Sequence, residues 1–179
     1  AGDSQEKTVF AAKVTNAGTP TVTVTFAGTR DNKQMTIVVL RGGDVTGTPP
    51  DQGGSAAQTG VTAVSTGNIT PSNDGQIVIS SMQDVSAGSV TVTKEATATM
   101  LSDTDTTDGC FTQYEIQATA AAIDGDFSLS ASRDVISCVR SYKIAAAGGG
   151  AGKRGLVNAG LVGVGDSGQG LVNSGLVAA

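Results

Sequence analysis

The stretch Thr21-Val22-Thr23-Val24-Thr25-Phe26 decides the fold class. Val22, Val24 and Phe26 alternate with threonine, so an extended chain has one apolar face and one polar face here. Such alternation is typical of a strand that is buried on one side and hydrated on the other, as in antiparallel sheets. The stretch therefore predicts an antiparallel β-strand.

The same two-residue alternation recurs along the first 144 residues, between turn signals such as Asn73-Asp74-Gly75. It predicts further strands at residues 8–15, 35–41, 61–65, 76–81, 89–100, 111–119, 127–131 and 135–144. Many short strands with little helical periodicity predict an all-β domain, an antiparallel β-sandwich that is Ig-like or jelly-roll-like. Residues 42–60 are rich in glycine, proline and polar side chains, and we expect a mobile surface loop there.

The composition excludes several kinds of catalytic site. The 179 residues include 25 glycines and 23 threonines but no tryptophan and no histidine. Histidine is the commonest general base and the commonest metal ligand. Without it the chain cannot build Ser-His-Asp or Cys-His catalysis or an imidazole-bound zinc site. We therefore expect no catalytic residues and no enzymatic activity.

Charge and hydropathy exclude two further classes of protein. The net charge is −5, only 15% of residues are charged, and no lysine or arginine lies between Lys94 and Arg133. Nucleic-acid binding depends on clustered basic side chains, so we expect no nucleic-acid partner. No run approaches the roughly 18 apolar residues that a membrane helix needs, so we do not expect an integral membrane protein.

The two cysteines, Cys110 and Cys138, lie 28 positions apart and form no CxxC motif. An even count is compatible with one disulfide and an oxidising compartment. The chain also begins at Ala1, as it would after removal of a signal peptide. We therefore predict a disulfide between the two cysteines in a secreted or cell-surface protein, with two buried thiols as the alternative.

The composition changes after Ile144, where the β domain of residues 1–144 is expected to end. Residues 145–154, AAAGGGAGKR, are typical of a flexible linker. Residues 155–179 then divide into the pentads GLVNA, GLVGV, GDSGQ, GLVNS and GLVAA. This glycine-rich C-terminal extension is apolar on both faces of an extended chain, and such a segment requires burial on both faces.

We expect the apolar pentads to contact a neighbouring subunit, because an exposed apolar segment promotes association unless something covers it. The candidate subunit-contact residues are the apolar positions of the pentads and of residues 8–15, namely Val9, Phe10, Val14, Leu156, Val157, Leu161, Val162, Leu171, Val172, Leu176 and Val177. Two alternatives are that the tail packs on its own domain as final strands, or that it remains an elastic tail.

A short acidic run precedes the first cysteine. Asp103, Asp105 and Asp108 lie close together before Gly109, and hard cations such as Ca²⁺ prefer several carboxylate oxygens. The run is a candidate calcium site, and calcium is the one cofactor that the sequence suggests. Its spacing departs from the EF-hand pattern, and a solvated hairpin loop is the alternative.

These features favour a structural subunit of an extracellular homopolymeric filament or pilus-like fibre, whose partners are copies of itself. In architecture the pattern is similar to that of the strand-donating subunits of bacterial and archaeal extracellular fibres. One alternative is a virion structural protein, such as a phage tail, capsid-decoration or fibre component. A second alternative is a calcium-dependent adhesion or binding module.

Overall fold

A computed structural model of the chain describes residues 11, 21–25, 33–41, 50–86, 88–103, 109–144, 155–157 and 161–164. Within these residues all regular structure is β-strand, and there is no helix. The all-β antiparallel class predicted from the sequence is therefore confirmed for the described part of the chain.

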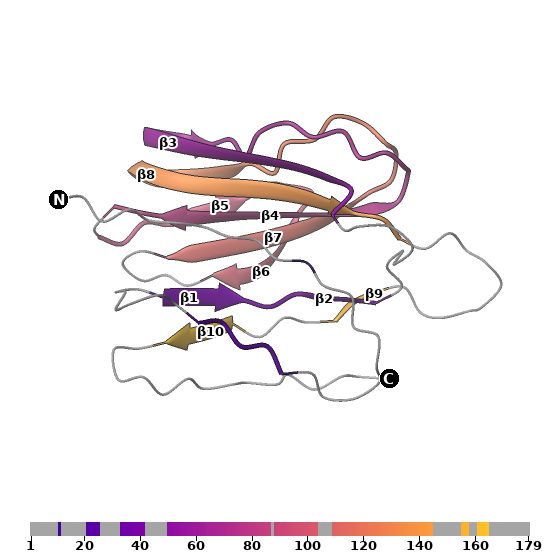
Figure 1. Ribbon diagram of the computed structural model, residues 1–179. Coiled ribbons are helices and arrows are strands. Elements are labelled where there is room, and N and C mark those ends of the chain that lie inside the picture. The colour runs from indigo at the N-terminus through magenta and orange to yellow at the C-terminus, as the bar shows by residue number, and fades with distance from the viewer. Residues whose placement is uncertain are drawn as a thin grey trace.

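The largest unit is an antiparallel sheet of six strands (Figure 1). Its strands run in the order β3-β8-β4-β7-β6, and β5 pairs with β8 outside this path. Their bounds are β3 Gln52–Val64, β4 Gln76–Asp84, β5 Val92–Lys94, β6 Thr99–Asp103, β7 Cys110–Gln117 and β8 Phe127–Tyr142.

The sixteen-residue strand β8 organises this sheet. Its C-terminal half lies between β3 and β4, so that Cys138 pairs with Ser55 on one side and with Ser81 on the other. Its N-terminal end continues beyond β4 and pairs with β5 through Leu129 and Val92. One strand therefore joins three others that are distant from it in sequence.

The core lies on one face of the sheet. Along β4 the even-numbered side chains from Gln76 to Asp84 are all buried, as the two-residue period of a strand requires. The larger apolar cluster on this face contains Val64, Met82, Val90, Phe111, Phe127, Leu129 and Val135. A smaller cluster of Ile69, Val78 and Val139 adjoins the bridge between Ile69 and Ile123.

The opposite face of the sheet also carries buried side chains. Ile77, Thr112 and Cys138 alternate with the core residues of their strands, and they are 4%, 2% and 6% exposed. By contrast Ile116, on the same face at the end of β7, is 59% exposed. The sheet is therefore covered on both faces at its centre.

Four short strands form two separate antiparallel pairs. β1, Lys33–Thr36, pairs with β10, Leu161–Val164, and β2, Val39–Arg41, pairs with β9, Gly155–Val157. Each pair joins an N-terminal strand to one of the apolar pentads. The two pairs lie on the β6 side of the large sheet in the view of Figure 1.

The predicted strands agree best with the observed strands in the centre of the chain. Those at residues 76–81 and 111–119 correspond to β4 and β7, and those at 127–131 and 135–144 join into the single strand β8. The strand predicted at residues 35–41 is interrupted at residues 37 and 38, and the one at 89–100 is reduced to β5 and the start of β6.

Two sequence-based expectations are wrong. Residues 21–25 belong to no strand, because the β-propensity of alternating Val and Thr forms a strand only where a neighbouring strand supplies main-chain partners. Residues 52–60, expected within a surface loop, form most of β3 because their backbone pairs with β8. Of the strand predicted at residues 8–15 only Ala11 is described, and it is exposed and not in a strand.

The predicted disulfide is also wrong, since Cys110 and Cys138 are not bonded to each other. Cys110 lies on β7 opposite Gln83, whereas Cys138 lies on β8 opposite Ser81. Strand β4 runs between them, which separates their backbones by two strand spacings of about 4.8 Å each. A disulfide requires Cα atoms no more than about 7 Å apart. Cys110 and Cys138 are therefore two thiols, which is the alternative to a disulfide that the sequence left open.

Candidate functional site

Residues 21–25 form an exposed segment of alternating threonine and valine. All five residues are exposed, with Val22 at 55% and Val24 at 44% of their full accessible surface. None of the described strands pairs with them. The segment thus presents apolar side chains and a strand-forming backbone that pairs with no described strand, and this composition is suited to pairing with another strand.

Strand β3 forms an edge of the large sheet at the top of Figure 1. It pairs with β8 on one side, and no described strand pairs with its other side. Its sequence, QGGSAAQTGVTAV, contains no charged residue and no proline. Natural sheets protect exposed edges with charges, prolines, bulges or short strands. In β3 the register shifts between Gln58 and Val61 and again between Val61 and Ala63, and Nη1 of Arg140 donates to the carbonyl oxygen of Gly54.

Two glycines near the start of β3 lie in close contact with neighbouring residues. A Cβ at Gly53 would lie 2.7 Å from Cδ of Arg140, whose side chain crosses this part of the strand. A Cβ at Gly54 would lie 3.1 Å from the carbonyl oxygen of Gly67 on the core side. A larger side chain at either of these two positions would require the neighbouring atoms to move.

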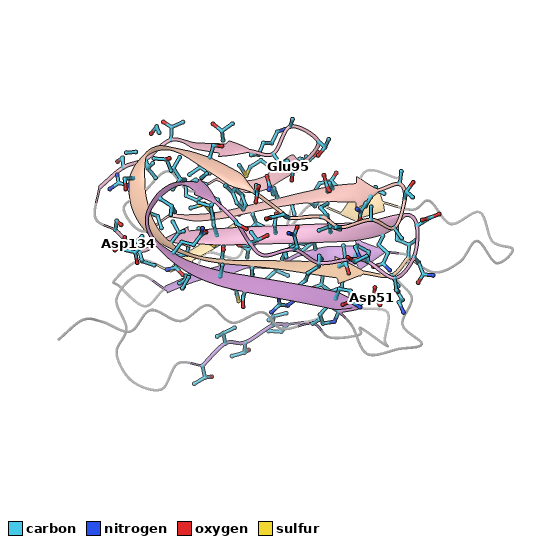
Figure 2. The ribbon with its side chains drawn as sticks, turned by 90° about the horizontal axis from the view of Figure 1, so that it is seen from above. Asp51, Glu95 and Asp134 are labelled. Carbon is cyan, nitrogen blue, oxygen red and sulfur yellow. The ribbon has the colours of Figure 1, made fainter. Side chains whose placement is uncertain are left out.

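A polar cluster anchors the residue that precedes β3 (Figure 2). The Asp51 carboxylate accepts hydrogen bonds from the main-chain N–H and the hydroxyl of Ser72 and from Nε2 of Gln76, and it pairs with Nζ of Lys143 at 3.1 Å. Burial alone would raise the pKa of Asp51, but these partners lower it to about 2. The cluster fixes where β3 begins.

Acidic side chains gather where the chain enters β8. Asp124 accepts hydrogen bonds from the hydroxyl of Ser65 and from the main-chain N–H and hydroxyl of Thr66. Burial, a hydrogen bond with Asp124, and the charges of Asp124 and Glu95 raise the pKa of Asp126 to about 7. Burial alone would also raise the pKa of Asp124, but its hydrogen bonds with Asp126, Ser65 and Thr66 lower this pKa below the ordinary value.

These acids do not form a metal site in the described part of the chain, where no group of three or more Asp, Glu, Cys or His side chains could hold an ion. For the predicted calcium site, Asp103 ends β6, where its backbone pairs with Phe111. Asp105 and Asp108 lie outside the described residues. Calcium binding at this run remains a prediction.

The predicted subunit-contact residues are only partly described. Leu156 and Val157 lie in β9 opposite Leu40 and Val39, and Leu161 and Val162 lie in β10 opposite Thr36 and Met35. The described pentads thus pair with strands of their own chain. The remaining candidates, Val9, Phe10, Val14, Leu171, Val172, Leu176 and Val177, lie outside the described residues.

The edge formed by β3 was missed in the sequence because glycine, alanine and serine are weak strand formers. One feature of the sequence could have indicated a strand here, because residues 52–64, which follow Pro49-Pro50-Asp51, contain no proline and no charged residue.

Within the described ranges no helix has the length and apolar character that crossing a membrane requires. No family model, curated protein or solved structure matches this chain, so its function is inferred from its own residues.

Proposed function

We propose that this chain is the structural subunit of an extracellular homopolymeric filament or pilus-like fibre, assembled through strand or tail exchange between copies. The observation that carries the proposal is the exposed segment of residues 21–25, which presents Val22 and Val24 and pairs with no described strand. An unpaired strand-forming segment is stabilised when it adds to a sheet of another molecule. No enzymatic activity is part of the proposal.

The fold supports this role in a second way. We infer that the two strand pairs β1–β10 and β2–β9 belong to the second layer of a β-sandwich, which ends in the glycine-rich extension of residues 155–179. The buried side chains Ile77, Thr112 and Cys138 on the face opposite the main core favour such a layer. β-Sandwiches with extended terminal segments can exchange strands without remodelling their cores.

The proposal is tested on the full-length chain by sedimentation velocity and negative-stain electron microscopy. We expect polymers that grow with concentration. Leu171→Asp combined with Leu176→Asp tests the tail, and Ser167→Asp combined with Gln169→Asp in the polar pentad is the matched control with the same added charge. Loss of polymers in the first variant alone would assign assembly to the apolar pentads, whereas a wild-type chain that stays monomeric at all concentrations would refute the proposal.

A virion structural protein is the second candidate. The position of Cys110 and Cys138 on strands separated by β4 favours it, because a chain that assembles in a reducing cytoplasm needs no disulfide. Virion assembly would yield closed shells or tubes of defined diameter in the same electron micrographs. Open fibres of unlimited length would instead favour the filament.

A further inference from the structure

We propose that the outer edge of β3 is the acceptor for residues 21–25 of a second copy of this chain, which extend the six-stranded sheet by one strand. The inference rests on the proposed homopolymer and names the two surfaces that would join its subunits. Both surfaces lie within the described residues, and neither pairs with another described strand on the side in question.

The two surfaces of one molecule lie far apart. β3 forms the top edge of the large sheet in Figure 1, whereas the indigo segment of residues 21–25 runs beneath β10 at the bottom of the same view. The segment of one copy therefore meets the β3 edge of another copy in this arrangement.

The electrostatics of the two surfaces permit contact. Residues 21–25 carry no charge, and the thirteen residues of β3 carry none either. Charged side chains at a sheet edge oppose the approach of another strand, and their absence from both sequences lowers that barrier. The Arg140 side chain of β8 crosses Gly53 and donates to the carbonyl oxygen of Gly54, so its charge lies at the start of this edge. A strand that joined this edge would bury no unpaired charge from either segment.

The side chains of the two segments also complement each other. Gly54, Ala56 and Gln58 lie on the core face of β3, because they pair with Val139, Ser137 and Val135. Val22 and Val24 would lie on this same face, beside the small side chain of Ala56, and would extend the core face. Thr21, Thr23 and Thr25 would then lie on the face of Gly53, Ser55 and Ala57.

The length of the regular edge sets the size of the segment it can accept. β3 pairs with β8 without interruption from Gln52 to Gln58, and its register shifts beyond that residue. This regular part is longer than residues 21–25. The shift between Gln58 and Val61 bends the remainder of the strand and limits pairing beyond it.

A contact between two different surfaces has a consequence for symmetry. Each copy would use its segment to join one neighbour and its β3 edge to join another. Such a head-to-tail contact generates a ring if it closes and an open helical fibre if it does not. The number of copies is then unlimited in the open case.

The test uses one variant on each surface of the full-length chain. Thr23→Pro blocks strand formation in the segment, with Thr23→Ser as its control. Ala57→Lys places a charge on the exposed side of β3, with Thr119→Lys as a control that adds the same charge at an exposed site after β7. We expect both test variants to sediment as folded monomers that unfold cooperatively, and both controls to polymerise.

Mixing the two test variants provides the sharper result. Thr23→Pro keeps its β3 edge and Ala57→Lys keeps its segment, so one junction remains possible, and we expect a one-to-one heterodimer and no larger species. Polymerisation of either single variant at the wild-type level would overturn the inference and leave the proposed homopolymer intact.

A peptide assay covers the case in which the wild-type chain does not polymerise. A fluorescent peptide of residues 20–27 should bind the wild-type protein and lose binding to Ala57→Lys but not to Thr119→Lys. A monomeric wild-type chain that binds this peptide would refute the homopolymer but keep the acceptor edge. Equal or undetectable binding to all three proteins would overturn the acceptor edge itself.

Discussion

The Asp134 carboxylate on β8 accepts a hydrogen bond from the main-chain N–H of Gly60 on β3, with 2.8 Å between Oδ1 and the nitrogen. Gly60 has a φ of 66°, in the left-handed region, and lies within the register shift between Gln58 and Val61. The Asp134 side chain therefore satisfies a backbone donor that the shift removes from the β ladder, and it fixes the position of the bend.

Substitution of Gly60 should destabilise the bend. We expect Gly60→Ala to lower the free energy of unfolding by about 1–2 kcal/mol, because a side chain disfavours the left-handed region. Asparagine tolerates this region better, so Gly60→Asn should cost less than Gly60→Ala. Urea unfolding measures both, and equal stability of wild type and Gly60→Ala would contradict the role of the glycine.

Gly125 lies against Ser80 in the core, and its main-chain N–H donates to Oγ1 of Thr66 at 2.9 Å. A Cβ at Gly125 would overlap the Ser80 side chain, so Gly125→Ala should cost about 1–3 kcal/mol of stability through overpacking. Ser80→Gly should recover part of this loss in the double variant. Additive losses in a double-mutant cycle would show that the two side chains do not compete for space.

The buried pair of Asp84 and Arg133 offers a third test. Asp84 is 1% exposed, and its Oδ2 lies 3.3 Å from Nε of Arg133. Arg133→Met leaves the buried carboxylate without its counter-ion and should cost about 3–5 kcal/mol. Asp84→Asn should reduce that cost in the double variant, because the neutral amide tolerates burial better. A cost for Arg133→Met below 1 kcal/mol, on the order of a surface ion pair, would contradict the prediction.

Stability should depend on pH through Asp126. Its pKa in the folded chain is about 7, above the ordinary value of 3.8, so the folded state keeps a proton that the unfolded state has lost. This contribution is complete below pH 3.8 and is lost as the pH rises to about 7. Asp126 is only partly desolvated and keeps contact with solvent, so screening by water keeps the effect small.

Asp126→Asn isolates this contribution, because the amide cannot ionise. We expect its melting temperature to fall less than that of the wild type between pH 4 and pH 7, as followed by circular dichroism. Identical pH profiles for the two proteins would exclude Asp126 as the titrating group.

The sequence predicts the strands that have apolar side chains on a regular period, and it fails where other strands decide the outcome. β4 and β7 are recognisable because Ile77, Val78, Phe111 and Ile116 lie among polar residues in short runs. β3 is not recognisable from its glycines and alanines. Its place in the sheet depends on backbone pairing with β8, and its small side chains give no sign of that pairing. Residues 21–25 show the converse, since strong propensity produces no strand without a partner.

The candidate site is likewise predictable only in those features that depend on local sequence. The tendency of the chain to expose apolar strand-forming segments is visible in its composition, but which segments are exposed depends on long-range pairing. The cysteine pair illustrates the limit, because a spacing of 28 positions does not reveal that β4 lies between Cys110 and Cys138. Sheet order, rather than distance along the chain, decides which side chains can meet.

The central place of β8 has a consequence for biosynthesis. Ser141 meets Gln52 across 89 positions, and β3 and β4 are both completed long before residues 127–142 leave the ribosome. Until then these two strands have no partner between them, and neighbouring nascent chains on one message can pair through them instead. Among the described strands, the last long one to be made is the one that closes the sheet, so we expect the timing of translation and the protection of the growing chain to influence how much native protein a cell obtains.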